Sequence, residues 1–95
     1  MTHIHIKKCN SKYEILVEGH NEKLICAGIS TLVASFSGYL ENFDKGYSYK
    51  DGDGVCKIKA SKKAKEAVMM FLIGALRLEC TYPDKVKVIT NINKF

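Results

Sequence analysis

The spacing of apolar residues switches between two periods along this chain of 95 residues. In three regions apolar and polar residues alternate, which is the pattern of a strand with one buried face. Between these regions lie two stretches with the three-to-four-residue spacing of an amphipathic helix. The order that follows is β-β-α-β-β-α-β. Because the sheet and both helices must bury an apolar face, we predict an α+β fold, a two-layer sandwich in which a five-stranded sheet carries two helices on one face.

The predicted strands are short and are bounded by turn residues. Alternation covers 4–6 and 13–17, with a break at 10–11, and it returns at 47–50, 55–59 and 86–90. The run Asp51-Gly52-Asp53-Gly54 separates two of these strands and is a strong hairpin signal. A calcium loop is excluded there, because its twelfth position is Lys62 instead of glutamate.

The first predicted helix spans about 24–42, and the second runs from an N-cap at Ser61 to about Cys80. The expected buried stripe of the first helix is Leu24, Ile25, Gly28, Ile29, Leu32, Val33, Phe36, Leu40 and Phe43. The second helix has its own stripe, but three further apolar residues lie off it: Met69, Met70 and Ile73. A helix with two apolar sides needs a second cover, so we expect a homodimer that uses this helix.

Length and composition support one globular domain over 1–95. No apolar run is long enough for a membrane span or a secretion signal, so we expect a cytoplasmic protein with no membrane contact and with free thiols. The net charge is +5, but only one of the 15 basic residues is an arginine, Arg77. Because nucleic-acid readers favour arginine, we expect nucleic-acid contact that is weak at most.

The candidate site combines His20, at the end of the second strand, with Cys26, near the start of the first helix. The N-terminus of a helix favours a thiolate and offers unpaired N–H groups to an oxyanion, and a nearby imidazole can accept the thiol proton. Cys26 is expected at the edge of the buried stripe, with Ser30 on the same flank one turn later. The spacing alone also fits a plain alternative, in which Cys26 packs at a helix edge and His20 lies in a turn. The other three cysteines are interpreted as small buried hydrophobes.

The residues around His20 and Cys26 resemble the signature of a known protein family. Gly19-His20, followed by Ile25-Cys26-Ala27-Gly28-Ile29-Ser30, resembles the signature of the ribosomal-processing cysteine proteases, the Prp family. The resemblance implies a homodimeric cysteine endopeptidase that removes an N-terminal extension from a large-subunit ribosomal protein, after an aromatic residue. It implies Cys26 as nucleophile, His20 as base, and Ser30, Gly19 and Ala27 as supporting residues, with no cofactor. The protein substrate is then this extension or a phage protein.

Two departures from the family pattern touch the mechanism. The segment between His20 and Cys26 is only five residues, where the family has a longer glycine-rich loop, and Lys23 stands where the family tends to have an aspartate. A lysine cannot cap a helix N-terminus. We therefore predict that Asn21 is the N-cap, which puts Cys26 in the second turn with its N–H already used within the helix.

The alternative function is a non-catalytic α/β module that binds ribosome or RNA through a lysine-rich face: Lys57, Lys59, Lys62, Lys63 and Lys65. His3 and His5 share a strand face, but no third ligand is evident, so no metal site is predicted. An acidic residue that orients His20 is left open among four candidates: Glu22, Asp44, Asp51 and Asp53.

Overall fold

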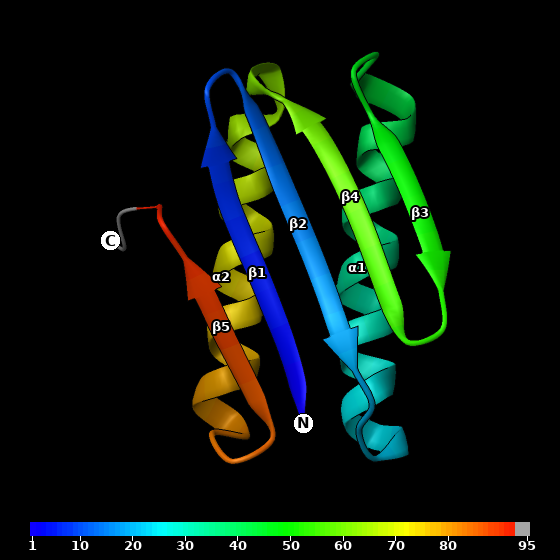
Figure 1. The fold of residues 1–95 in the computed structure, drawn as a ribbon, viewed down its shortest axis with the longest axis vertical. Coiled ribbons are helices and arrows are strands. Elements are labelled where there is room, and N and C mark those ends of the chain that lie inside the picture. The colour runs from blue at the N-terminus through cyan, green and yellow to red at the C-terminus, as the bar shows by residue number, and fades with distance from the viewer. Residues whose placement is uncertain (93–95) are drawn as a thin grey trace.

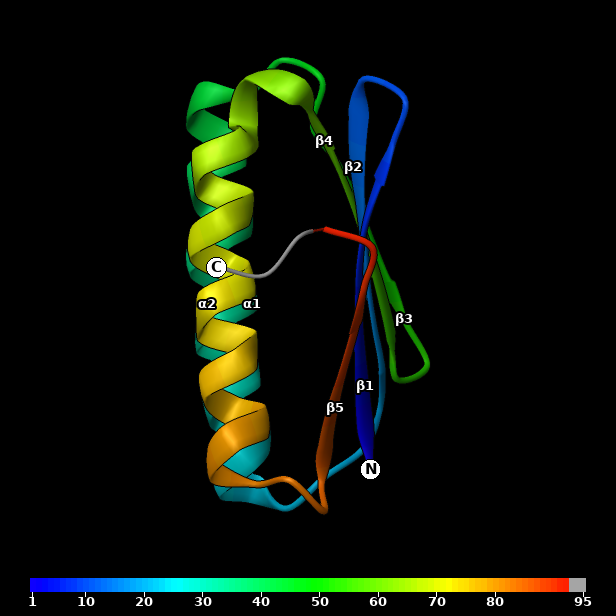
Figure 2. The same ribbon diagram turned by 90° about the vertical axis from the view of Figure 1, so that its left-hand side faces the viewer.

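The computed structural model describes residues 1–92, which form one five-stranded sheet with two helices on the same face (Figures 1 and 2). The predicted fold class and element order are confirmed. In chain order the elements are β1 (Thr2–Cys9), β2 (Lys12–Gly19), α1 (Lys23–Phe43), β3 (Ser48–Gly52), β4 (Val55–Ser61), a 3-10 turn η1 (Lys62–Ala64), α2 (Lys65–Thr81) and β5 (Val86–Thr90).

The strands lie in the order β3-β4-β2-β1-β5. β1 pairs parallel with β5, and the other three pairings are antiparallel. Residue Ile15 of β2 lies opposite Ile6 on β1 and opposite Ile58 on β4, so the buried side chains of three strands form a continuous row. This register brings the inward-facing residues of each strand onto the face that the helices cover.

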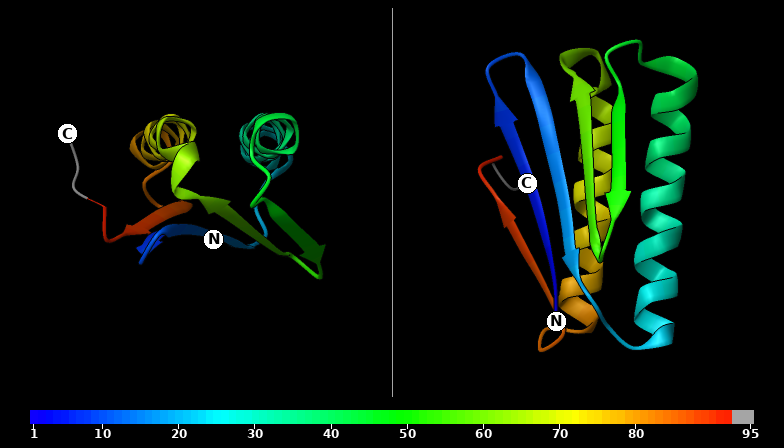
Figure 3. Two further views of the ribbon diagram at one scale, coloured as in Figure 1. Left: turned by 90° about the horizontal axis from the view of Figure 1, so that it is seen from above. Right: turned by 45° about the vertical axis from the view of Figure 1, so that its right-hand side comes forward.

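The two helices share the sheet between them. α2 covers the side of β1 and β5, and α1 covers the side of β4 and β3 (Figures 1 and 3). The core lies between the layers, and Phe36 of α1 stacks on Phe71 of α2 with ring centroids 4.8 Å apart. The buried stripe of α1 is narrower than predicted, because Leu24 and Phe43 are 74% and 73% exposed. Both lie at the ends of the helix, where the sheet no longer covers them.

By length and composition alone, α1 is apolar enough to cross a membrane: its 18-residue window has a mean hydropathy of 1.4. In the structure one stripe of this helix packs onto the sheet, and the remaining residues around the helix are exposed or half-buried. The buried stripe consists of Ile25, Ile29, Val33, Phe36 and Leu40. A helix whose regularly spaced residues fill the core of a two-layer domain passes the same test of length and hydropathy, so we interpret α1 as the core helix of this domain.

A carboxylate links the end of α1 to the start of the α2 segment. Asp44, the C-cap of α1, accepts hydrogen bonds from the Ser61 N–H at 2.9 Å, the Ser61 hydroxyl at 2.8 Å and the Gly46 N–H at 2.9 Å. Ser61 is the predicted N-cap, and its hydroxyl accepts from the Lys63 N–H at 3.3 Å. The helical segment therefore starts where predicted, with a 3-10 turn before the α-helix proper.

Two glycines allow close backbone approaches at the end of the sheet that bears the candidate site. Gly19 has φ +105°, and a Cβ there would lie 2.2 Å from the carbonyl oxygen of Met1. Gly54, in the β3–β4 turn, has φ +74°, and a Cβ there would lie 2.7 Å from Nε2 of His20. The Gly19 N–H donates to the Gly54 carbonyl at 3.0 Å. Only glycine fits both the backbone angles and the space at these positions.

The structure corrects one prediction about burial, that of the cysteines, and agrees with another, that of the apolar residues off the α2 stripe. Cys9 and Cys80 are exposed and Cys56 is half-buried, so these cysteines are not buried core residues. Cys9 falls on the side of β1 that faces away from the helices, in step with His3 and His5, and Cys80 lies near the end of α2, outside its buried stripe. The apolar residues off the α2 stripe lie where predicted, outside the core: Met70 is 74% and Ile73 is 43% exposed.

Candidate functional site

The site lies at the junction between β2 and α1. After Gly19 the chain crosses from the sheet to the helix layer in three residues, 20–22. Asn21 anchors this crossing: its amide nitrogen donates to the Thr2 hydroxyl at 3.1 Å and to the Lys85 carbonyl at 2.7 Å. The loop is thereby held against the start of β1 and the turn before β5.

The predicted N-cap is wrong. Glu22, and not Asn21, is the N-cap of α1, and it makes no side-chain capping hydrogen bond. The Asn21 side chain is used instead to join the loop to its neighbours, which places the cap one residue later. The first-turn N–H groups at 23–25 have no intrahelical partner, and because Glu22 makes no capping hydrogen bond, its side chain does not satisfy them either.

Cys26 is the fourth residue of α1. Its N–H donates to the Glu22 carbonyl at 2.8 Å, so the prediction that this N–H is used within the helix is confirmed. Its thiol is half-buried and donates to the Asn21 carbonyl at 3.1 Å. An anion at this end of the helix would therefore meet the free N–H groups of 23–25 and not that of Cys26.

A cleft of about 410 Å³ opens beside the thiol, between α1 and the β3–β4 hairpin. Cys26 and Ser30 both line it, one helical turn apart, so the predicted placement on one flank is confirmed. Gly19 lines the cleft as well, whereas Ala27 is exposed and lies outside it. The floor is apolar and the opposite wall is polar, which is the usual character of a small binding site.

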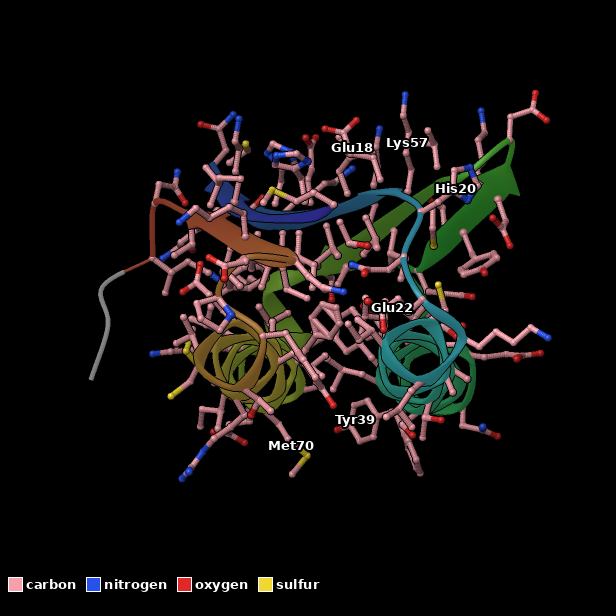
Figure 4. The ribbon with its side chains drawn as sticks, turned by 90° about the horizontal axis from the view of Figure 1, so that it is seen from below. Glu18, His20, Glu22, Tyr39, Lys57 and Met70 are labelled. Carbon is pink, nitrogen blue, oxygen red and sulfur yellow. The ribbon has the colours of Figure 1, made fainter. Side chains whose placement is uncertain are left out.

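His20 is not brought onto the thiol. Its side chain is exposed, and its ring lies against Gly54 in the β3–β4 turn. Figure 4 shows His20 level with the sheet, while Glu22 marks the start of the helix layer. Within residues 1–92 no hydrogen bond joins His20 to Cys26. Cys26 therefore lines the cleft, and His20 lies outside the lining, against Gly54, so the two do not form a hydrogen-bonded dyad in this structure.

The wall opposite Cys26 contains Tyr49 and Cys56, which the sequence did not lead us to place in the site, and Asp51, which was considered only as a partner of His20. The Tyr49 hydroxyl donates to the Asp51 carboxylate at 3.3 Å, and Asp51 lies opposite Cys56 in the register. Alternation along both strands places these three on the inward face, so the period of two could have revealed them once the hairpin was recognised.

Two thiols line the cleft, Cys26 and Cys56, and the surroundings of Cys56 make it the less reactive of the two. Burial raises the pKa of the Cys56 thiol, and the charge of Asp51 acts in the same direction. Hydrogen bonding with Cys56 together with burial raises the pKa of Tyr49 to about 12. Cys56 is therefore protonated and a poor nucleophile at neutral pH. This leaves Cys26 as the candidate nucleophile of the cleft.

The four acidic residues considered as partners of His20 have other contacts or positions. Glu22 pairs with Lys85, Asp51 accepts from Tyr49, and Asp44 lies at the far end of α1. Asp53 lies in the β3–β4 turn with φ +44°. Across the described part of the chain no carboxylate contacts His20, and no three metal-ligating side chains gather.

Fold and site together define a two-layer α+β domain with a thiol at the start of its first helix, facing a cleft of about 410 Å³.

Neither the family models nor the curated protein sequences compared with this chain match it. Two solved structures share its fold. One is the essential ribosomal processing protease Prp from S. aureus in complex with a covalently linked product peptide, with a TM-score of 0.79 and 17% identity over 96% of this chain and all of that one. The other is a hypothetical protein from Staphylococcus aureus, with a TM-score of 0.71, 16% identity and the same coverage. The chain therefore has the fold of this ribosomal processing protease.

Proposed function

We propose that this protein is a cysteine endopeptidase of the ribosomal-processing type, with Cys26 as nucleophile and His20 as its base. The observation that carries the proposal is the Cys26 thiol at the unfilled N-terminus of α1, facing a cleft, in a fold that a processing protease shares. The solved protease holds a covalently linked product peptide. We therefore expect a peptide substrate to bind in the cleft beside Cys26.

The reaction requires His20 to leave Gly54 and reach the thiol. The proposed trigger is a peptide that enters the cleft beside residues 20–22 and replaces the Asn21 carbonyl as the partner of Cys26. His20 then takes the thiol proton while the sulfur attacks the peptide carbonyl carbon. The free N–H groups at 23–25 stabilise the oxyanion, and the imidazolium gives its proton to the leaving amine. Water, deprotonated by His20, then attacks the thioester carbonyl and releases the new carboxylate and the thiol.

The proposed substrate is a protein, the N-terminal extension of a large-subunit ribosomal protein or of a phage protein, cut after an aromatic residue. The proposed compartment is the cytoplasm, where thiols stay reduced. In this proposal Ser30 supports the site from one turn further along the cleft, and Gly19 supports it where the chain leaves β2. Ala27 is proposed to support it only through its backbone, next to the nucleophile, because its exposed side chain lies outside the cleft.

We further propose a homodimer through the outer face of the two helices. An apolar groove of about 330 Å³ lies there, with Leu32 and Tyr39 of α1 on one side and Ala67 and Met70 of α2 on the other. Figure 4 shows Tyr39 and Met70 projecting away from the sheet. A second copy would cover these exposed side chains and remove their apolar surface from water.

The test is cleavage of internally quenched peptides that carry an aromatic residue before the scissile bond, including one from a ribosomal-protein extension. Wild-type protein should cut such a peptide, and Cys26→Ala and His20→Ala should abolish turnover. The matched control is Cys80→Ala, which removes an exposed thiol on α2 and should cut at the wild-type rate. If no peptide is cut, the proposal is wrong and the non-catalytic binding module is favoured. If Cys26→Ala retains full activity, Cys26 is not the nucleophile and the proposed mechanism is wrong.

A further inference from the structure

The helices cover only one face of the sheet, and the other face is open (Figures 2 and 3). Outward-facing residues alternate with core residues along every strand, and Figure 4 shows Glu18 and Lys57 on this side, away from both helices. All six outward lysines on the strands are exposed. We call this surface the open face, and its basic residues are Lys7, Lys12, Lys50, Lys57, Lys59 and Lys87.

The open face has fewer acids than bases. Glu14 lies opposite Lys7 on β1 and Lys59 on β4, so it offsets part of that charge. Glu18 is engaged by His5, with Nε2 and Oε1 3.1 Å apart. No carboxylate on this face lies opposite Lys50 or Lys57 in the register.

Lys50 and Lys57 lie directly opposite one another on β3 and β4. Like charges in that position repel and destabilise a sheet, and a bound anion would relieve the repulsion. A hollow of about 470 Å³ lies beside this pair, and Leu16, Ser48 and Lys59 line it together with Glu14, the one carboxylate of its lining. Side chains on neighbouring strands are about 4.8 Å apart and alternate residues of one strand about 6.7 Å apart, which is the scale of the phosphate spacing in a single strand.

Two aromatic rings lie beside the lysines. His3 and His5 of β1 share the open face with their ring centroids 6.4 Å apart and their planes 32° from parallel. Glu18 orients the His5 ring, and Lys87 of β5 lies opposite His3. β1 is an interior strand with Lys87 on its neighbour β5, and Lys57 lies on β4, one strand beyond β2. Rings and basic residues on one sheet face form a surface on which unpaired bases stack while phosphates meet the lysines.

We propose that the open face binds single-stranded nucleic acid, with phosphates on Lys50, Lys57 and Lys87 and bases against His3 and His5. Binding is independent of sequence and of micromolar strength, because lysines contact phosphate as point charges and do not read base edges. An anionic lipid surface fits less well, because within residues 1–92 the register places few large apolar side chains on this face, namely Leu16 and Ile89. The proposal does not rest on peptidase activity, because the cleft lies on the helix side of the sheet.

The experiment measures fluorescence anisotropy of labelled 12-residue oligo(U) and oligo(dT) at 50 and 200 mM salt. The test variant is Lys50→Gln with Lys57→Gln, and the matched control is Lys62→Gln with Lys63→Gln, which removes the same charge in η1, outside the open face. The test variant should weaken binding at least tenfold and reduce the salt slope by about 1.4, since each phosphate contact on a single strand contributes about 0.7. The control should change affinity less than threefold.

A second variant measures the contribution of base stacking to the affinity separately from the contribution of charge. His3→Ala with His5→Ala should weaken binding about tenfold while leaving the salt slope unchanged. Equal binding of both oligonucleotides supports backbone and stacking contacts common to RNA and DNA, and preference for oligo(U) restricts the ligand to RNA. No binding at 50 mM salt, equal losses in the test and control variants, or binding only to vesicles of phosphatidylcholine with phosphatidylserine would overturn the proposal.

Discussion

Asp44→Ala should lower the free energy of unfolding by about 2–4 kcal/mol. The carboxylate of Asp44 accepts three hydrogen bonds, two from Ser61 and one from Gly46, at 2.8–2.9 Å. A hydrogen bond to a charged group contributes roughly 1.5–3 kcal/mol, and water replaces part of this at the exposed Gly46. Most of the loss therefore comes from the half-buried Ser61 N–H and hydroxyl, which would lose their partner between the end of α1 and the start of α2.

The same contact makes stability depend on pH. Burial by itself raises the pKa of Asp44, but the hydrogen bonds from Ser61 and Gly46 and the charge of Lys63 outweigh it and lower the pKa below its usual value. A lowered pKa in the folded state means that the stabilisation is fully present above the unfolded value near 3.9 and is lost as pH falls through the folded value. The difference between wild type and Asp44→Asn should therefore shrink below about pH 4.

Urea unfolding followed by circular dichroism at pH 7 and pH 3 measures both effects. The matched control is Asp84→Ala, an exposed aspartate with no side-chain hydrogen bond or ion pair within residues 1–92, which should stay within about 0.5 kcal/mol of wild type. An Asp44→Ala protein that unfolds within about 0.5 kcal/mol of wild type, or a difference for Asp44→Asn that is as large at pH 3 as at pH 7, would refute this account.

Three further predictions concern the site and the interface. Gly54→Ala should lower thermal stability by the equivalent of about 1–2 kcal/mol, because the φ of Gly54 is +74°, in the left-handed region. The new Cβ should also displace the His20 ring; unchanged stability, or a His20 NMR signal that does not shift, would contradict this. Asn21→Ala should cost roughly 1–3 kcal/mol in urea unfolding through the lost bonds to Thr2 and Lys85, and unchanged stability would contradict it. Met70→Lys should convert the proposed dimer into a monomer in light scattering, whereas a wild type that is already monomeric would remove the interface.

The amino-acid sequence by itself determined the elements and their faces. Periods of two and about 3.6 are local properties, so the order β-β-α-β-β-α-β and the inward placement of Ile15, Ile58 and Val68 followed from spacing. The flank shared by Cys26 and Ser30 followed in the same way, because one helical turn separates them. The cap was misplaced because Asn21 bonds to Thr2 and Lys85, and neither of those contacts is visible in local sequence.

Only the tertiary structure decided which strands lie side by side and what faces the thiol. The pairing of β1 with β5 and of β2 with β4 joins residues far apart in the chain, and no local pattern specifies it. That pairing puts Cys56 and Asp51 across the cleft from Cys26 and gathers the lysines of all five strands on the open face. It also draws His20 onto Gly54, since the β3–β4 turn ends beside β2 and only a glycine there leaves space for the ring.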